Sequence, residues 1–499
     1  MPTVQPDQNS NLGWEISKSK PAYDSRLPVL SPDERDFLLV LSARFSDYSR
    51  SHDVASPEAA REAVGHLLPL ALESEGLEID DEQRQYLTAA ALSHLAGFAP
   101  LDSMLSDPQV EEIAALGVDK PVYVYVRAKG WAPTNARITS MEHLVHLINK
   151  MARPLGRRIT SQYPRLNALL SNGSRLHASI PPLSDGEITI RLHSARPWSA
   201  LDLMSSHSTN AEALAFLWLA FQSDSSVMIV GNTSSGKTTL LNALFSFVPM
   251  GERVVLIEET PELRLLHPHR VQLVSSEELS IGMSDLVRDS LRMRPDRVIV
   301  GEVRTPPEAQ AFAETLLSGQ ARGSYATFHG QSAAEALRRL RNLGISADDL
   351  PSLDFIVLQR RIARYDPKTL KQEELRRMLG IYMLRQKQVG NEKTDKKVAS
   401  ARGKSSVSLS ASSSSPSVFS SSDAMSSIEL VPIFTYDPRA DKLAPAPGLG
   451  DALERLSSRL GMDRASAHSI YQSRKQFLSR LKPAPPDDIT KKVQEFAYR

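Results

Sequence analysis

From residue 212 onward, short apolar runs alternate with longer segments of helical spacing. VMIV, RVVLIEE, RVQLV, RVIVGEV and SYATFH are the apolar runs, and MSDLVRDSLRM, PPEAQAFAETLLS and SAAEALRRLRNLG are the helical segments between and after them. Continuous rather than alternating apolar runs are typical of parallel strands, because crossover helices cover both faces of their sheet. This half of the chain is therefore predicted to be an α/β domain with a mostly parallel sheet.

The stretch before residue 208 has a different pattern. Residues 31–100 are helical in spacing, and SPDERDFLLVLSARF opens with a serine cap followed by proline. PVYVYV and ARITS flank the turn-rich AKGWAPTN, MEHLVHLINKMARPLG predicts a helix, and LLSNGSRLHASI predicts a hairpin that turns at Asn172 and Gly173. EITIRLHS adds a further strand, so an α+β domain is expected here.

Serine dominates one segment near the C-terminus, with 14 serines among the 27 residues from 401 to 427. Such a segment cannot bury enough apolar surface to offset its conformational entropy, so disorder is predicted for 386–427. Its flanks, ELRRMLGIYML and IELVPIFTYDPRADKL, are strand-like. They are either two strands of one hairpin with a long insertion or the ends of an interdomain linker. Two amphipathic helices, split near Gly461, are expected in 449–482.

The predicted division of the chain has five parts. They are a loose and helical N-terminal extension (1–100), an α+β N-terminal domain (101–207), a P-loop domain (208–385), a disordered Lys/Ser-rich insertion (386–427) and a small C-terminal subdomain of a strand plus helices (428–499).

Charge and composition exclude several classes of function. The 59 basic and 58 acidic side chains give a formal net charge of +1, so no whole-molecule field attracts nucleic acid or anionic membranes. The absence of cysteine excludes disulfides, thiolate nucleophiles and cysteine-bound metals. With neither an apolar signal-peptide core nor an apolar stretch of membrane-spanning length, we expect a cytoplasmic protein that reaches a membrane only through a partner.

The strongest chemical signal is GNTSSGKT, which fits the phosphate-loop pattern GxxxxGK[ST] and stands between a predicted strand and a predicted helix. Glycines allow the backbone N–H groups to turn toward a polyphosphate, Lys237 neutralises phosphate oxygens, and Thr238 places a hydroxyl on Mg²⁺. ATP and Mg²⁺ are thus the expected ligands. The predicted nucleotide-binding residues are Gly231, Asn232, Thr233, Ser234, Ser235, Gly236, Lys237, Thr238 and Thr239.

Acidic residues follow two of the other predicted strands. Glu302 ends RVIVGEV and is expected to polarise the attacking water, while Glu258 and Glu259 end RVVLIEE and are expected to hold the metal together with Thr238. The alternative for each acid alone is a solvated strand end. His329 ends SYATFH and is expected near Glu302, the alternative being a structural histidine.

Four motifs in this order resemble those of the type II/IV secretion and type IV pilus assembly ATPases, especially the archaeal branch related to the archaellum motor. GNTSSGKTTLLNAL is similar to the Walker A motif of that family, VVLIEETPELRL to its Asp box, LRMRPDRVIVGEVR to its Walker B motif and GSYATFHGQSAAEALRRL to its His box. GWAPTN, NGSRLHASIPP and ITIRLHS are similar to its N-terminal domain, and DFIVLQRR and PIFTYDP to segments after its core. The resemblance covers about residues 100–385 and 428–482, and it implies a RecA-like core.

The resemblance also implies roles for particular residues. Glu302 would be the catalytic glutamate, Glu258 and Glu259 would serve the Asp box, and His329 would be the second His-box histidine. Arg175 and Arg191 match arginines that reach toward nucleotide in this family, the alternative being solvated arginines. Arg304 follows Glu302 as in the family pattern.

Three positions depart from that pattern. Gly301 replaces the usual Asp before the catalytic glutamate, Glu259 replaces the Asp of the Asp box, and Gln320 stands where a first histidine is common. A modified rather than an inactive enzyme is expected.

The function that the resemblance implies is an ATP-hydrolysing motor for assembly of a pilus or archaellum-like filament, or for protein secretion. It implies a homohexamer docked on a polytopic membrane platform protein, with a pilin-like or secreted substrate contacted indirectly. Nucleic acid is not an expected partner. The alternatives are a nucleic-acid translocase and a nucleotide-dependent scaffold with little turnover.

Overall fold

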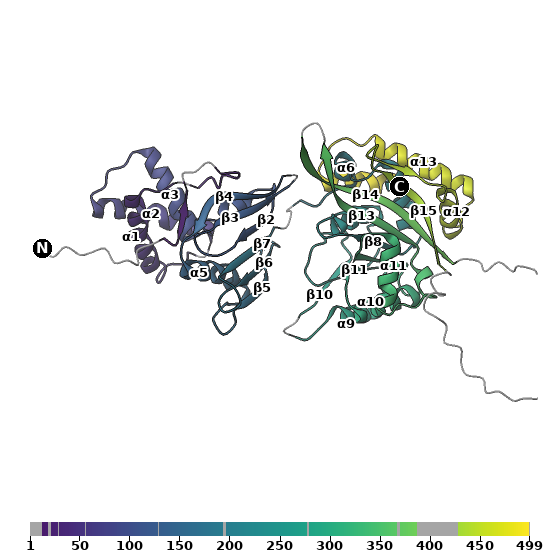
Figure 1. Ribbon diagram of the computed structural model, residues 1–499, viewed down its shortest axis with the longest axis horizontal. Helices are drawn as coiled ribbons and strands as arrows, with labels where there is room; N and C mark the ends of the chain where they lie inside the picture. The colour runs from purple at the N-terminus through teal and green to yellow at the C-terminus, as the bar shows by residue number, and fades with distance from the viewer. Residues whose placement is uncertain are drawn as a thin grey trace, which may run out of the picture. The chain divides into compact units, whose positions relative to one another are not determined.

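The computed structural model describes residues 12–498 except 18–20, 28, 55, 128, 193–195, 277–278, 367–369 and 387–427. The chain divides into two compact units (Figure 1). The first consists of Met1–Ala195 together with Tyr365–Glu374, and the second of Arg196–Arg364 and Leu375–Arg499. No helix in the described ranges has both the length and the apolar character needed to cross a bilayer.

A seven-stranded antiparallel sheet of order β1-β4-β3-β2-β7-β6-β5 forms the first unit together with five helices. Its strands are β1 (Trp14–Ile16), β2 (Val110–Ala115), β3 (Pro121–Val126), β4 (Gly130–Ile138), β5 (Arg165–Leu169), β6 (Arg175–Ser179) and β7 (Glu187–Arg191). Its helices are α1 (Pro32–Tyr48), α2 (Pro57–Glu75), α3 (Asp81–Leu95), α4 (Asp102–Ser106) and α5 (Met141–Ala152).

The helices before residue 100 share one hydrophobic core with this sheet, rather than forming an extension of their own. The serine cap predicted at Ser31 is confirmed as part of a capping box at the start of α1, and a second capping box at Asp80 starts α3. Each helix buries a single apolar face, and that face needs a partner surface. Even Trp14, in a stretch expected to be loose, is buried as part of β1, and its indole N–H donates to His94 Nδ1 at 3.1 Å.

The hairpin predicted at Asn172 and Gly173 is confirmed, since β5 pairs with β6 around a Gly173 with φ +83°. The turn between β3 and β4 differs from expectation, because most of the turn-rich segment lies inside β4. Pro133 has no N–H to give to a ladder, and it stands where the β3–β4 register shifts.

A nine-stranded sheet of order β10-β9-β11-β12-β8-β13-β14-β15-β16 organises the second unit. Six strands, from β10 to β13 in that order, are parallel, and β14 to β16 extend the sheet in antiparallel pairs. The strands are β8 (Val227–Gly231), β9 (Val254–Glu258), β10 (Arg270–Val274), β11 (Arg297–Val303), β12 (Gly323–His329), β13 (Phe355–Asp366), β14 (Lys371–Gln386), β15 (Ile428–Asp437) and β16 (Lys442–Pro445). The predicted α/β core with a mostly parallel sheet is confirmed, as is the α+β unit before it.

Helices cover both faces of the nine-stranded sheet (Figure 1). The helices of this unit are α6 (Ala200–Ser205), α7 (Ala211–Gln222), α8 (Lys237–Leu244), α9 (Met283–Ser290), α10 (Pro306–Leu317), α11 (Ala333–Asn342), α12 (Leu449–Arg459), α13 (Arg464–Ser479) and α14 (Pro486–Ala497). Successive residues of each central strand alternate between two cores, so α9, α10 and α11 pack on one face and α7, α8 and α12 to α14 on the other.

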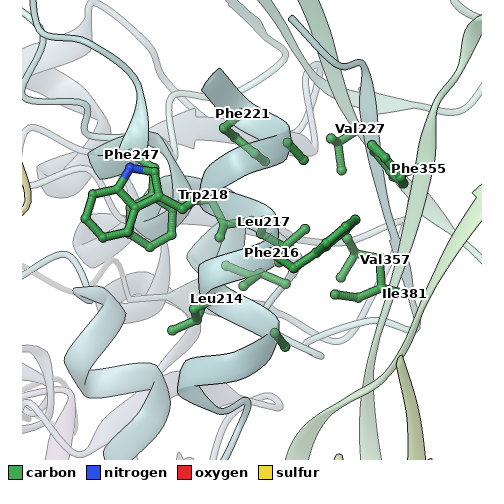
Figure 2. Packing of buried hydrophobic residues seen from close by; sticks show 14 of the residues in the cluster. Leu214, Phe216, Leu217, Trp218, Phe221, Val227, Phe247, Phe355, Val357 and Ile381 are labelled. Carbon is green, nitrogen blue, oxygen red and sulfur yellow. The ribbon is translucent and has the colours of Figure 1, made fainter. Parts of the chain in front are cut away.

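Helix α7 is apolar on all sides because it lies between the sheet and the C-terminal helices. Figure 2 shows Phe216 directed toward Phe355 of β13, while Trp218 stacks on Phe247 with ring centroids 4.8 Å apart. On its outer side Trp218 contacts Phe477 of α13 and Phe496 of α14. The C-terminal helices are therefore part of the core of this unit.

The two strand-like segments around the serine-rich stretch pair as one hairpin, with Gln386 of β14 opposite Ile428 of β15. The disorder predicted for 386–427 falls, except for Gln386, outside the described residues. The helices expected in 449–482 are present as α12 and α13, with a left-handed Gly461 (φ +65°) between them. Helix α14 follows them and was not predicted.

Candidate active site

Four parallel strands of the second unit end at one edge of the sheet, and each carries a predicted site residue there. β8 ends at Gly231, β9 at Glu258 and β12 at His329, while Glu302 is the last but one residue of β11. In the register of β12 with β8, His329 lies opposite Gly231. The strand order thus brings the phosphate loop, the acids and the histidine to the carboxyl edge, where parallel sheets bind ligands.

The loop between β8 and α8 requires its glycines. Gly236 has φ +89°, and a Cβ on Gly231 would lie 1.9 Å from the carbonyl oxygen of Gln359. α8 begins at Lys237, and no side chain in the described part of the chain caps its N-terminus. An uncapped helix N-terminus after a glycine-containing loop is a site for an anion such as phosphate, as GxxxxGK[ST] predicts.

The remaining loop residues line this turn. Thr233 is exposed, Ser235 is buried, and Ser234 adopts a left-handed conformation with φ +57°. Thr238 and Thr239 are half-buried in the first turn of α8, which is where the predicted hydroxyl ligand of Mg²⁺ has to stand.

The ammonium of Lys237 is buried and held beneath the loop. Its Nζ lies 3.4 Å from the carbonyl oxygen of Gly231 and 3.3 Å from that of Asn232. The Glu302 carboxylate lies 3.9 Å from the same nitrogen. The cation is therefore placed between the phosphate loop and the predicted catalytic glutamate.

Glu302 and His329 are direct partners, with 2.8 Å between Oε1 and Nε2. Burial lowers the pKa of His329, as do the nearby charges of Lys237 and Arg304, while Glu302 opposes them. A lowered pKa keeps the imidazole neutral at neutral pH, so Nε2–H donates to the carboxylate without forming an ion pair.

Arg304 joins the two predicted acidic motifs. Its Nε donates to Glu302 Oε2 at 2.7 Å, and its Nη1 donates to Glu259. The Arg304 N–H in turn donates to Glu308 at the start of α10. Glu302 is thereby fixed from two sides, by His329 at Oε1 and by Arg304 at Oε2.

Glu258 faces the chain that follows β9. Its carboxylate accepts from the N–H groups of Glu262 (2.9 Å) and Leu263 (3.0 Å) and from Gln272 Nε2 (2.8 Å). It is 2% exposed, and burial raises its pKa. These bonds tie the turn after β9 to β10, so the geometry supports a structural role for Glu258 beside its predicted role at the metal.

The phosphate loop also has contacts from β13 and β14 that the sequence did not suggest. The Asn232 side chain exchanges two hydrogen bonds with the Arg361 backbone, at 2.9 and 3.1 Å. Arg376 Nε donates to the Ser234 carbonyl at 2.9 Å, and Gln359 Nε2 to the Ser235 carbonyl at 3.1 Å. The segment DFIVLQRR, which lies at the start of β13, resembles the family, but nothing in its sequence indicates that Gln359 contacts the loop.

Arg175 and Arg191 lie directly opposite each other on β6 and β7 of the first unit. Glu112 of β2 stands opposite Arg191, and although burial raises the pKa of Glu112, Arg191 opposes that shift. Both arginines remain predictions as nucleotide ligands.

The family model for "Type II/IV secretion system protein" matches residues 95–417, well over half of the chain. The chain belongs to this family. The family predicted from the four motifs is thus confirmed.

Relatives of this secretion-system protein occur in archaea and bacteria. An uncharacterized protein of Methanocaldococcus jannaschii, MJ0781, is 33% identical over 259 residues, which are 46% of this chain and 36% of that protein. A second, MJ0900, is 30% identical over 53% of this chain and 48% of its own length. The chain thus spans less than half the length of either. The type IV secretion system protein PtlH homolog of Bordetella bronchiseptica is 32% identical over 46% of this chain and 76% of its own.

Among solved structures, the Legionella pneumophila ATPase DotB is similar at 20% identity, over 57% of this chain and 80% of that one, with a TM-score of 0.40. The pilus retraction motor PilT with bound ADP is similar at 16% identity, over 55% and 78% of the two chains, with a TM-score of 0.41.

The three positions that depart from the family pattern lie in different surroundings. A Cβ at Gly301 would lie 3.1 Å from Glu258 Cγ, so the usual Asp would require the buried Glu258 to shift slightly. Glu259 reaches Arg304. Gln320 precedes β12, whereas His329 ends it, so Gln320 lies exposed at the opposite edge of the sheet.

Proposed function

We propose that the protein is a Mg²⁺-dependent ATPase whose catalytic base is Glu302. The observation that carries this proposal is the position of the Glu302 carboxylate, 3.9 Å from Lys237 Nζ and 2.8 Å from His329 Nε2. A carboxylate at the mouth of a phosphate loop, held beside its lysine, is placed to orient a water for in-line attack on a γ-phosphate.

The donor set fits ATP and Mg²⁺. Lys237 and the uncapped start of α8 offer positive charge to phosphates, and Thr238 offers a hydroxyl in the first helical turn. In the described residues no group of three or more His, Asp or Glu side chains is placed to hold a metal by itself. Mg²⁺ characteristically takes one or two protein ligands together with nucleotide phosphates. When bound, it neutralises charge that develops on the transferred phosphoryl group.

The residues around Glu302 have separate roles in this proposal. His329 donates to Glu302 Oε1 and Arg304 donates to Oε2, so these two side chains orient the carboxylate. Lys237 is fixed by two carbonyl oxygens and is prepared to bind phosphate oxygens. Glu259 is bound to Arg304 and positions that arginine.

The cellular role that we propose is a motor for type II/IV secretion or for assembly of a pilus or archaellum-like filament. Support comes from the family model, from the PtlH-type relative and from the archaeal relatives, which favour an archaeal-type motor. The proposal includes a homohexameric ring and a polytopic membrane platform protein that holds it at the inner face of the membrane from the cytoplasm.

Phosphate release from ATP by the purified full-length chain tests the enzyme. We expect slow hydrolysis that requires Mg²⁺ and is abolished by Lys237→Ala. Wild-type protein that binds ATP and yet releases no phosphate, with lipid and platform protein present, would instead establish the scaffold alternative. Stimulation by DNA, but not by lipid or platform protein, would establish the translocase alternative.

A further inference from the structure

A glutamine outside the four ordered motifs touches the phosphate loop from the neighbouring strand. Gln359 lies on β13, next to Leu358, which pairs with Val230 of β8, so its backbone runs beside Gly231. The approach is so close that Gly231 has no room for a Cβ. The side chain is 2% exposed, and its environment is therefore protein rather than water.

Both hydrogens of the Gln359 amide are engaged. Nε2 donates to the Ser235 carbonyl at 3.1 Å and to Ser208 Oγ at 3.0 Å. The Ser235 carbonyl can only accept, so it determines that the nitrogen and not the oxygen of the amide faces the loop. The Ser208 carbonyl accepts from the Met378 N–H of β14 at 2.7 Å, and Ser208 is thus itself held by the sheet.

Two complementary atoms beside these bonds have no partner. Gln359 Oε1 and Ser235 Oγ are both buried, and neither has a hydrogen bond among the residues that the structure describes. One is an acceptor and the other is a hydroxyl that can donate, and buried polar groups are normally paired. Gln359 Oε1 and Ser235 Oγ are therefore a chemically complementary acceptor and donor.

We infer that Gln359 is a positioning residue of the nucleotide site. Its amide turns the Ser235 carbonyl away from the phosphates, so that the N–H groups of the loop face them. Its Oε1 accepts from Ser235 Oγ–H when the loop tightens around a nucleotide. This inference rests on the nucleotide binding proposed above and adds a residue outside the four ordered motifs to that site.

Binding of a fluorescent methylanthraniloyl-ATP with Mg²⁺ tests the inference in three variants of the full chain. Gln359→Met keeps the volume and removes the hydrogen bonds, and we expect Kd to rise at least tenfold. Gln359→Glu places a carboxylate against the Ser235 carbonyl oxygen at about pH 8, and we expect Kd to rise more than in Gln359→Met. At about pH 5.5 a buried glutamic acid is protonated and donates again, so the affinity of Gln359→Glu should recover. Gln320→Glu, the same change at the opposite edge, should bind as the wild type does.

The outcomes separate this inference from the proposed function. A wild type that does not bind the ATP analogue refutes nucleotide binding itself. A wild type that binds, with Gln359→Met binding equally well, overturns the inference even if Gln359→Glu is impaired, because charge repulsion alone then explains the glutamate. If Gln359→Met does not fold, Ser208→Ala replaces it. We expect its Kd to rise severalfold, and an unchanged Kd also overturns the inference.

Discussion

Two clusters of charged side chains lie at opposite edges of the nine-stranded sheet and use similar residues differently. At the amino edge, Arg297 is fully buried and bonds Glu252 (2.5 and 3.2 Å), Asp224 (3.1 Å) and the Tyr325 hydroxyl (3.0 Å). Arg322 binds the same two acids. At the carboxyl edge, by contrast, two carbonyl oxygens at 3.3 and 3.4 Å and a carboxylate 3.9 Å away lie near the charge of Lys237.

We call the cluster around Arg297 the closed cluster and the cluster around Lys237 and Glu302 the open cluster. Around Arg297, opposite charges and hydrogen bonds surround the guanidinium, so burial of the charge is compensated and the cluster holds the strand starts together. Around Lys237 and Glu302, the loop and helix start still offer positive charge to an anion. A closed network serves stability, and an open one serves binding and catalysis.

Glu302→Gln should give the largest effect, and only on the open cluster. An amide keeps the shape, and its oxygen still accepts from Arg304, but its NH₂ cannot accept from His329 Nε2–H and the group cannot take a proton, so kcat for ATP hydrolysis should fall by about 10²–10⁴-fold. Phosphate release measures the rate, and thermal melting should show Tm within about 2 °C of wild type. The control is Glu314→Gln, an exposed glutamate that pairs with Arg288 on the covering helices. Retained turnover in Glu302→Gln would assign the base elsewhere.

Arg297→Met, in the closed cluster, should lower the stability of the protein and leave its turnover nearly unchanged. The change leaves Glu252 as a buried carboxylate with one arginine fewer, and breaking such a pair destabilises a protein by about 3–5 kcal/mol. Urea unfolding measures this free energy, while kcat per folded molecule should stay close to wild type. Arg288→Met, at an exposed pair, should lose less than about 1 kcal/mol. Equal stability of the two variants would contradict the contrast between the clusters.

The pH dependence of turnover should come from His329. Its pKa is lowered by burial and by Lys237 and Arg304, with Arg339 adding to them and Glu302 opposing. Above that pKa the ring is neutral and leaves Glu302 its basicity. Below it, an imidazolium pairs with the carboxylate and weakens the base. Hydrolysis should therefore fall with acid at a pH below about 6.5, the ordinary value for histidine.

His329→Gln isolates this effect, because an amide keeps a hydrogen bond to Glu302 and does not titrate in this range. We expect the hydrolysis rate of this variant at neutral pH to be within about tenfold of wild type. As the pH is lowered, its rate should not fall at the midpoint pH at which the wild-type rate falls. Rate–pH profiles of both proteins make the comparison. If the rates of wild type and His329→Gln fall in the same way at acidic pH, the titration belongs to another group.

Sequence patterns predicted the parallel core, its strand ends and the phosphate loop, because local spacing and one continuous motif carry that information. They did not reveal Gln359 or Arg376, whose contacts with the loop depend on β13 and β14 lying beside β8. Nor did they reveal that a side chain at Gly301 would press on Glu258, because that residue belongs to another strand. Pairing between distant segments, such as β1 with β4, has no local signature either.

The smallest effect is expected for Glu259→Gln, at the outer side of the open cluster. The Glu259–Arg304 pair is about half exposed, so its loss should change the free energy of unfolding by less than about 1 kcal/mol. Arg304 keeps its bond to Glu302, so kcat should fall only severalfold. The Mg²⁺ concentration for half-maximal rate decides the role of this acid. A strongly raised requirement makes Glu259 a support of the metal, as the Asp-box resemblance implies, whereas an unchanged one leaves it a partner of Arg304. Glu262→Gln, a neighbouring acid after the same strand, is the matched control and should change neither quantity.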